Sequence, residues 1–250
     1  LTAVFATRSS QILGAETGNL ARLLLAILIM GIWFALAGHA IAAPAVFWFL
    51  AAGAVGFGIG GWFMFQALPR TGSTLALMIV ECASAIWAGL LGWIWLGAEL
   101  SVAQIGFASL AIAGVVTGLF PGRLPAVSRQ TLLLGAGLAV IASLGQALSF
   151  TASKQGFLVA AETAEPSPLS ASFYRLCAGG GVALLIWSIR SWILRRPGED
   201  APTGGRLIPH VLRRAWKWVF LNALAGPVLG VTAMLWAIRE VGNPGVVQAV

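Results

Sequence analysis

Residues 67–120 read ALPRTGSTLALMIVECASAIWAGLLGWIWLGAELSVAQIGFASLAIAGVVTGLF. This stretch holds two apolar segments, 73–97 and 102–120, which are joined by a short polar hinge. A helix needs about 20 residues to cross the hydrocarbon core of a bilayer, because each residue adds about 1.5 Å. Both segments have that length. The stretch therefore predicts two antiparallel membrane-spanning helices, and it sets the pattern that we look for in the rest of the chain.

The composition of the whole chain fits a membrane protein. Hydrophobic residues make up 59% of the chain and charged residues 9%, whereas a soluble domain usually carries about 25% charged residues. The net charge of +7 comes mostly from short connectors, which is a topology signal rather than a nucleic-acid surface. Cys82 and Cys177 lie in apolar segments, and both histidines lie in connectors. We therefore expect a lipid bilayer around the protein, no nucleic acid, no metal and no cofactor.

The same pattern recurs along the chain. Leu1 to Ala6 reads as the tail of a first helix that ends at residues 7–10, and the chain is expected to lack the rest of that helix. Polar connectors are expected at 69–72, 121–130, 151–168 and 195–217. A ninth span is expected to begin after Pro244 and to be cut short at Val250. The expected spans between these points are 19–38, 44–68, 73–97, 102–120, 131–150, 169–194 and 218–238.

An internal repeat relates the two parts of the chain. Arg22, which opens the second span, corresponds to Arg175, which opens the seventh. Five spans separate corresponding helices, so the two halves would enter the membrane from opposite sides, as in inverted-repeat transporters. Four further pairs share one offset of 170 residues: Gly56 and Gly226, Gly60 and Gly230, Ala67 and Ala237, and Gly72 and Gly242.

Residues 65–116, FQALPRTGSTLALMIVECASAIWAGLLGWIWLGAELSVAQIGFASLAIAGVV, resemble the third to fifth helices of the EamA-like family of the drug/metabolite transporter superfamily. The hinge Leu96-Gly97-Ala98-Glu99 is one residue longer than the Leu-Gly-Glu hinge of that family, and Ser84-Ala85-Ile86 replaces the usual proline of the fourth helix. The resemblance implies an all-α, multi-pass transmembrane bundle of two inverted five-helix repeats. The first repeat would cover residues 1–122 and the second residues 131–250.

Glu81 is the most conspicuous candidate for a functional residue. It lies about 13 Å along its helix, near the middle of a hydrocarbon core of about 30 Å. A carboxylate at that depth should face a cavity, pair with a cation or take up a proton. Two interpretations stay open: Glu81 binds a substrate amine or carries a coupling proton, or it is a structural residue that bonds between helices.

Other polar and aromatic residues inside the spans have similar pairs of interpretations. Arg22 and Arg175 would reach the membrane interface with their head groups, or would anchor a cavity entrance or pair with Glu81. The remaining candidates for substrate or coupling roles are three neutral amides, Gln66, Gln146 and Asn222, and two tryptophans, Trp62 and Trp236. The amides would join helices or contact substrate, and the tryptophans would line an aromatic pocket.

One motif points elsewhere and is rejected. Residues 56–61, GFGIGG, fit the dinucleotide-binding fingerprint. That fingerprint requires a soluble strand, turn and helix, whereas these residues lie inside an apolar span. Glycines in such a place allow neighbouring helices to approach closely. We therefore expect close helix packing at this position.

These observations predict a secondary transporter or exporter of small metabolites that works by alternating access across the cytoplasmic membrane, with proton coupling left open. All but three of the Lys and Arg residues lie on one predicted side, and the positive-inside rule places that side in the cytoplasm. The expected partners are a small-molecule substrate, the bilayer and, as an open alternative, a second copy of the chain. A membrane-embedded enzyme and a non-transporting structural subunit are the competing classes.

Overall fold

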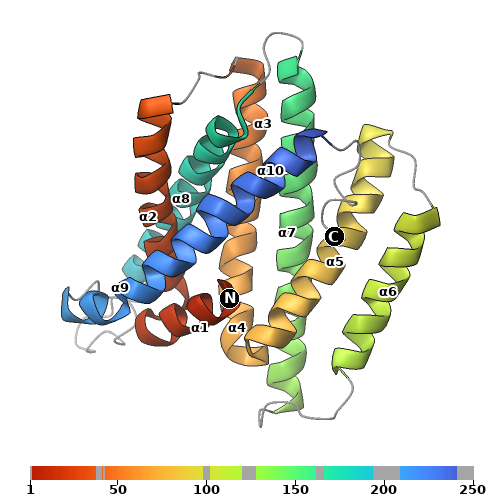
Figure 1. Ribbon diagram of the computed structural model, residues 1–250. Helices are drawn as coiled ribbons and strands as arrows, with labels where there is room; N and C mark the ends of the chain where they lie inside the picture. Colours follow the sequence, from red (N-terminus) through yellow and green to blue (C-terminus); the bar gives the residue numbers. More distant parts are fainter. Residues whose placement is uncertain are drawn as a thin grey trace.

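A computed structural model describes residues 2–37, 41, 43–97, 102–119, 128–161, 166–193 and 209–240. Within these ranges the chain is helical and contains no strand, as the sequence predicts (Figure 1). The long helices stand side by side, and one of them crosses the front of the bundle diagonally (Figure 1). The elements are α1 (Thr2–Leu13), α2 (Ala15–Ala37), α3 (Ala43–Gly53), η1 (Ala54–Gly60), α4 (Gly61–Thr71), α5 (Ser73–Leu96), α6 (Val102–Leu119), α7 (Arg129–Ala161), α8 (Pro168–Ile193), α9 (Pro209–Ala223), η2 (Leu224–Gly230) and α10 (Val231–Glu240).

Six helical segments of the described chain are long and apolar enough to cross a membrane: 15–37, 43–71, 73–96, 129–161, 168–193 and 215–240. Their outward sides carry large apolar side chains; Leu36 and Ile94, for example, are 78% and 74% exposed. Such surfaces suit contact with lipid, which solvates apolar side chains but leaves no water for unpaired backbone groups. The multi-pass helical bundle is thus confirmed. α6 begins and ends close to its predicted place, although it is not one of the six segments.

Two of the spanning segments contain a π-helical interruption, η1 and η2. The backbone N–H of Gly61 donates to the carbonyl of Gly56, and that of Val231 to the carbonyl of Gly226, so each hydrogen bond spans five residues. π-helical turns are rare and occur frequently at functional sites. Both η2 boundaries, 224 and 230, lie 170 residues after those of η1, 54 and 60. The interruption therefore occurs at the same place in the repeat that the sequence indicates.

Helices that correspond in the proposed repeat run in opposite directions. At one end of the α2–α8 pair, Glu16 contacts Arg190, and at the other end the rings of Phe34 and Phe173 stack with centroids 4.7 Å apart. α2 and α8 are therefore antiparallel. The segment α3–η1–α4 likewise descends in Figure 1, whereas α9–η2–α10 rises.

Glycines bring the helices close together, as expected. A Cβ atom added to Gly145 of α7 would lie 3.1 Å from the Cα of Gly60 of η1. A Cβ atom on Gly179 of α8 would lie 2.8 Å from the Gly53 carbonyl oxygen. Side chains at these positions would force the backbones apart. The motif at 56–61 thus lies in a packed π-helical segment rather than in a nucleotide-binding turn.

Several predicted boundaries are wrong, because polar residues extend the helices instead of ending them. α1 continues through residues 7–10 to Leu13, since the hydroxyls of Ser9 and Ser10 donate to helix carbonyls three residues back. α4 continues through the predicted turn at 69–72, and Gly72, with φ of +77°, ends it. α9 begins at Pro209, although the connector was expected to run to residue 217.

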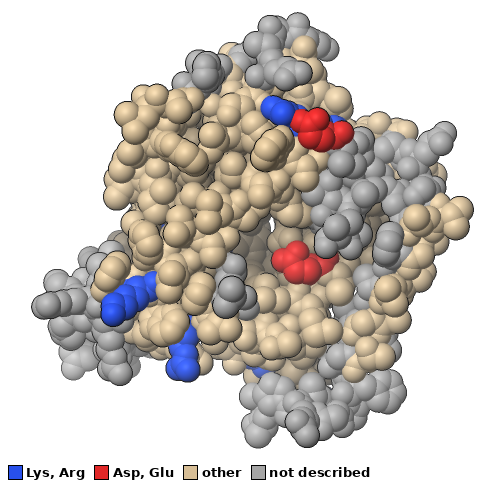
Figure 2. Space-filling view, viewed as in Figure 1, with Lys and Arg blue, Asp and Glu red and all other residues tan. Residues whose placement is uncertain are grey.

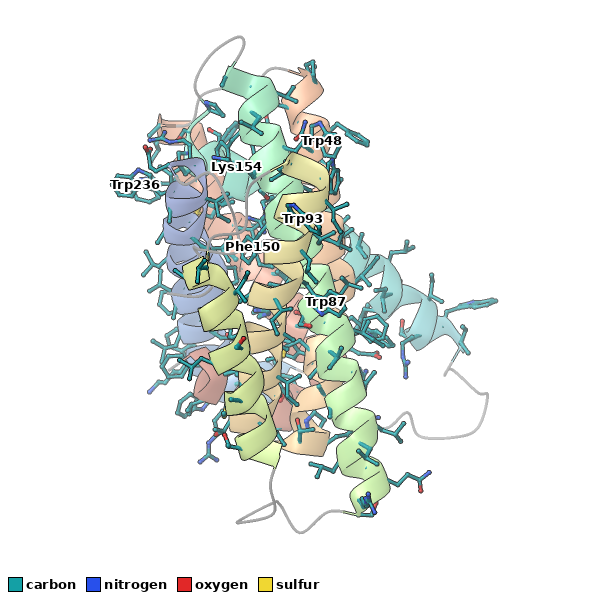
Figure 3. The ribbon with its side chains drawn as sticks, turned by 90° about the vertical axis from the view of Figure 1, so that its right-hand side faces the viewer. Trp48, Trp87, Trp93, Phe150, Lys154 and Trp236 are labelled. Atoms are coloured by element: carbon teal, nitrogen blue, oxygen red, sulfur yellow. The ribbon has the colours of Figure 1, made fainter. Side chains whose placement is uncertain are left out.

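The largest difference concerns α7, which extends 11 residues beyond its predicted end at Phe150, to Ala161. The hydroxyls of Thr151 and Ser153 donate to carbonyls four residues back. Lys154 donates to the carbonyls of Ile238 and Arg239 at the end of α10, at 3.1 Å each. Figure 3 shows Lys154 beside α10. A polar run was thus mistaken for a connector because its partners come from its own helix and from a distant one.

Some predictions lie outside the described residues. They are the hinge carboxylate Glu99, most of the connectors at 121–130 and 195–217, the pair of Gly72 with Gly242, and the ninth span after Pro244.

Candidate functional site

A cavity of about 330 Å³ lies among the helices. Its walls come from α1, α2, η1, α4 and α5 on one side of the proposed repeat boundary, and from α7, α8, α9, η2 and α10 on the other. Figure 2 shows a hollow between α10 and α5 with an acidic side chain at its edge. The two π-helical segments both line the cavity, with Gly56, Phe57 and Gly60 from η1, and Gly226, Pro227 and Gly230 from η2.

Five of the eight predicted site residues line this cavity: Arg22, Glu81, Gln146, Arg175 and Asn222. They come from five different helices, so only the fold brings them together. Most of the remaining lining is apolar, with Phe65, Phe150 and Val80 among its members. A concave, mostly apolar pocket with a few convergent polar groups is the usual form of a small-molecule site.

Glu81 stands on α5 and accepts a hydrogen bond from Nε2 of Gln146 at 3.1 Å. Among the described residues it forms no ion pair, so neither Arg22 nor Arg175 pairs with it as one interpretation proposed. The hydroxyl of Ser84 donates to the main-chain carbonyl of Glu81 at 3.0 Å and accepts a hydrogen bond from Nε2 of Gln146 at 3.5 Å. The Glu81 carboxylate therefore faces the cavity and has one amide donor.

Arg175 is the largest buried side chain of the site and is 2% exposed. Its Nη2 donates to Oγ of Ser149 at 2.8 Å, and its guanidinium carbon lies 5.5 Å and 5.1 Å from the ring centroids of Phe57 and Phe150. Phe150 lies in the interior of the bundle (Figure 3). Nε and Nη1 of Arg175 have no hydrogen-bond partner among the described residues. This arginine therefore does not snorkel to the interface, and part of its hydrogen-bonding capacity is unused.

Asn222 presents a second unused group. The residue lies on α9 and is fully buried, at 0% exposed. Neither its amide oxygen nor its amide nitrogen has a partner in the part of the chain that the structure describes. Buried polar groups are normally hydrogen-bonded. An unpaired amide on a cavity wall therefore points to an occupant of that cavity.

Arg22 is held differently from Arg175. Its Nε donates to Oδ1 of Asn19 on the same helix at 3.0 Å, and its guanidinium carbon lies 4.7 Å from the centroid of the Phe65 ring. It is partly rather than fully buried. The two arginines that correspond in the proposed repeat thus line one cavity, but each contacts different groups.

The other three predicted site residues lie outside the cavity. Trp62 and Gln66 both donate to Oε1 of Glu16 at 3.2 Å, and Glu16 also pairs with Nε of Arg190 at 2.6 Å. These side chains form a network at one end of the bundle that joins α2, α4 and α8. Trp236 is 61% exposed and points away from the bundle (Figure 3), so it suits a lipid contact.

The sequence interpretation missed several lining residues. Ser149 and Phe57, which hold Arg175, carry no signal of their own, because serine and phenylalanine are common in apolar helices. Met64 and Met234 both line the cavity and are separated by the same offset as the paired glycines. Extending the repeat alignment from Gly60 and Gly230 by four residues would have found them. Among the described residues no group of three His, Cys, Asp or Glu side chains could hold a metal ion.

Comparison with known proteins finds one similarity, in the N-terminal part of the chain. The profile of the EamA-like transporter family matches residues 1–119. These residues are therefore similar to that family. No curated protein and no solved structure gives a significant match. The EamA-like match and the six apolar spans together support a multi-pass membrane transporter of the drug/metabolite type, with a small-molecule substrate.

Proposed function

We propose that the chain is a secondary transporter, or exporter, that moves small metabolites across the cytoplasmic membrane by alternating access. The observation that carries this proposal is the cavity, because elements that correspond in the proposed repeat line it. Gly60 and Gly230 face it from the two π-helical segments, and Met64 and Met234 face it one turn further on. Substrate sites of inverted-repeat transporters lie at such an interface.

The two halves are proposed to be inverted repeats, residues 1–122 and 131–250. The antiparallel pair α2 and α8 and the opposite directions of the two π-interrupted segments support this relation. Two halves of this kind would expose the cavity to one side of the membrane and then to the other by moving against each other. Glycine contacts such as that between Gly60 and Gly145 supply the close, smooth surfaces along which helices shift.

The first experiment measures flux. The purified chain is reconstituted into liposomes that contain a mixture of small amines, amino acids and monocarboxylates, and the solutes that leave are quantified by mass spectrometry. We expect selective loss of one solute or a few related ones. Liposomes without the protein are the control, because they lose solutes only by leakage. Chemical conversion without flux would instead favour a membrane-embedded enzyme, and neither flux nor conversion would favour a structural subunit.

The second experiment tests access from both sides. In a variant with Cys82 and Cys177 replaced by serine, Met64→Cys and Met234→Cys are labelled with a membrane-impermeant maleimide in vesicles of each orientation. Alternating access predicts that each cysteine reacts from both sides. Labelling confined to one side for both cysteines would contradict alternating access even if a solute bound.

A further inference from the structure

The cavity carries a chemical signature that narrows its ligand. We propose that Arg175 and Asn222 form the polar part of a binding site for a small amphipathic monocarboxylate. This inference rests on the proposed function in one respect, namely that the cavity is the substrate site. Its evidence is the hydrogen-bonding capacity that the walls of the cavity leave unused.

The first step concerns Arg175. A guanidinium has five N–H donors in a planar fork that matches a carboxylate or a phosphate. In this chain one donor interaction goes to Ser149, whereas Nε and Nη1 have no acceptor among the described residues. A buried charged group is costly when some of its hydrogen-bond donors have no acceptor. Because Arg175 lines the cavity, a ligand in that cavity can supply the missing acceptors.

The second step concerns charge. Among the residues that the structure describes, the charged ones that line the cavity are Arg22, Arg175 and Glu81. In their ordinary charge states they sum to one positive charge, and Glu81 pairs with neither arginine. A ligand with one negative charge balances this sum. A carboxylate has one negative charge, whereas a phosphate monoester carries between one and a half and about two near neutral pH.

The third step concerns the rest of the ligand. Phe57 and Phe150 flank the Arg175 guanidinium, and Phe65, Met64 and Met234 continue the lining. These walls favour an apolar or aromatic body next to the charged group. Asn222, with an unpaired amide on another helix, offers both a donor and an acceptor. An aromatic or branched carboxylate with one further polar group fits this arrangement.

The experiment compares four related probes for binding to the purified chain in nanodiscs by isothermal titration calorimetry. Phenylacetate carries the carboxylate, phenylacetamide is its neutral analogue, phenethylamine carries the opposite charge, and phenyl phosphate carries the larger anion. We expect phenylacetate to bind about tenfold or more tightly than phenylacetamide, because the neutral amide cannot form the charge-assisted hydrogen bond with Arg175. Equal binding of these two probes, or tightest binding of phenyl phosphate or phenethylamine, would overturn the proposal.

Variants separate a specific site from a general positive charge. Arg175→Gln removes a positive charge from the cavity wall, whereas Arg239→Gln removes one at the surface, where Arg239 pairs with Glu240 and does not line the cavity. Arg239→Gln is therefore the control. We expect the preference for phenylacetate over phenylacetamide to disappear in Arg175→Gln and to persist in Arg239→Gln. Equal loss in both variants would show that only the net charge matters and would overturn the role of Arg175. Arg175→Lys, which keeps the charge but not the fork, should retain a reduced preference.

Folding and transport are checked independently. Size-exclusion chromatography in detergent shows which variants fold, and if no Arg175 variant does, the comparison of the four probes on the unmodified chain still decides. Carboxylate-selective binding without flux would refute the transport function and leave this inference standing. Flux of a solute without any preference for a carboxylate would refute this inference and leave the transport function standing.

Discussion

Lys154 illustrates how a charged residue becomes part of an apolar bundle. Its ammonium group donates to two carbonyls at the end of α10, and the side chain is 7% exposed. The last carbonyls of a helix have no partners within that helix. Lys154 therefore caps α10 from α7, a helix that is distant in the sequence.

Replacing this lysine with methionine should destabilise the protein. Lys154→Met keeps much of the volume but leaves the two α10 carbonyls unpaired, at a cost of about 1–3 kcal/mol. Unfolding by SDS titration, followed by tryptophan fluorescence, measures this cost. Arg239→Gln is the control, because Arg239 pairs with the exposed Glu240 at the surface and should change stability by less than about 0.5 kcal/mol. Similar stabilities for both variants would contradict the capping role.

Glu81 allows a test of coupling that leaves the local geometry in place. Glutamine at this position can still accept the hydrogen bond that Gln146 donates to Glu81 at 3.1 Å, but it cannot exchange a proton. If Glu81 carries the coupling proton, Glu81→Gln should abolish the pH dependence of flux while the variant remains folded. Flux measured in liposomes across a series of external pH values checks this. An unchanged pH profile would remove Glu81 as the coupling group.

At the scale of elements, some of the glycines lie at close contacts between backbones and others do not. α7 provides a matched pair of glycines for a test. Gly145 faces the backbone of Gly60, whereas Gly137 of the same helix has nothing within 4 Å of an added Cβ atom. The requirement for glycine is therefore local and belongs to the contact between α7 and η1.

Alanine substitutions at these two positions should have opposite effects. Gly145→Ala should destabilise the protein by about 1–3 kcal/mol, because the methyl group overpacks the contact. Gly137→Ala should be neutral or stabilising by up to about 1 kcal/mol, because alanine has the higher helix propensity. Both values come from the same SDS unfolding assay. Equal effects would show that the helices adjust freely and that the close contact has no energetic weight.

The elements also show how far the sequence predicts this fold. α5, α6 and α8 begin and end within about two residues of their predicted bounds, because their apolar runs stop where the helices stop. The end of α7 was missed because Thr151, Ser153 and Lys154 satisfy their polar groups inside the bundle, which hydropathy does not reveal. Glu81, Arg175 and Asn222 stood out as polar residues in apolar spans. Their meeting in one cavity required the fold.

At the scale of the whole molecule, one polar network joins elements of the two proposed halves. Glu16 of α2 pairs with Arg190 of α8 and also accepts hydrogen bonds from Trp62 and Gln66 of α4. Arg190 also lies 5.9 Å above the Trp62 ring. If the two halves move against each other during transport, this network has to open in every cycle.

A covalent link between α2 and α8 at the position of this network should therefore stop transport. In a background without Cys82 and Cys177, Glu16→Cys and Arg190→Cys are introduced together and joined by a short reducible bifunctional reagent. We expect flux in liposomes to fall at least about tenfold on cross-linking, since a trapped state cannot complete the cycle, and to recover after reduction. Each single-cysteine variant treated in the same way is the control. Full flux in the cross-linked protein would rule out movement between α2 and α8.

The π-helical segment Ala54–Gly60 has a consequence for which face of the following helix, α4, is turned toward the cavity. A π turn holds one more residue than an α turn, and each residue rotates an α-helix by about 100°. The extra residue thus determines which side of α4 carries Met64 toward the cavity. Removing a single residue from the segment would restore an ordinary helix and swing Met64 toward a different neighbour. The one extra residue of the π turn thus determines which side chains of α4 a solute in the cavity would contact.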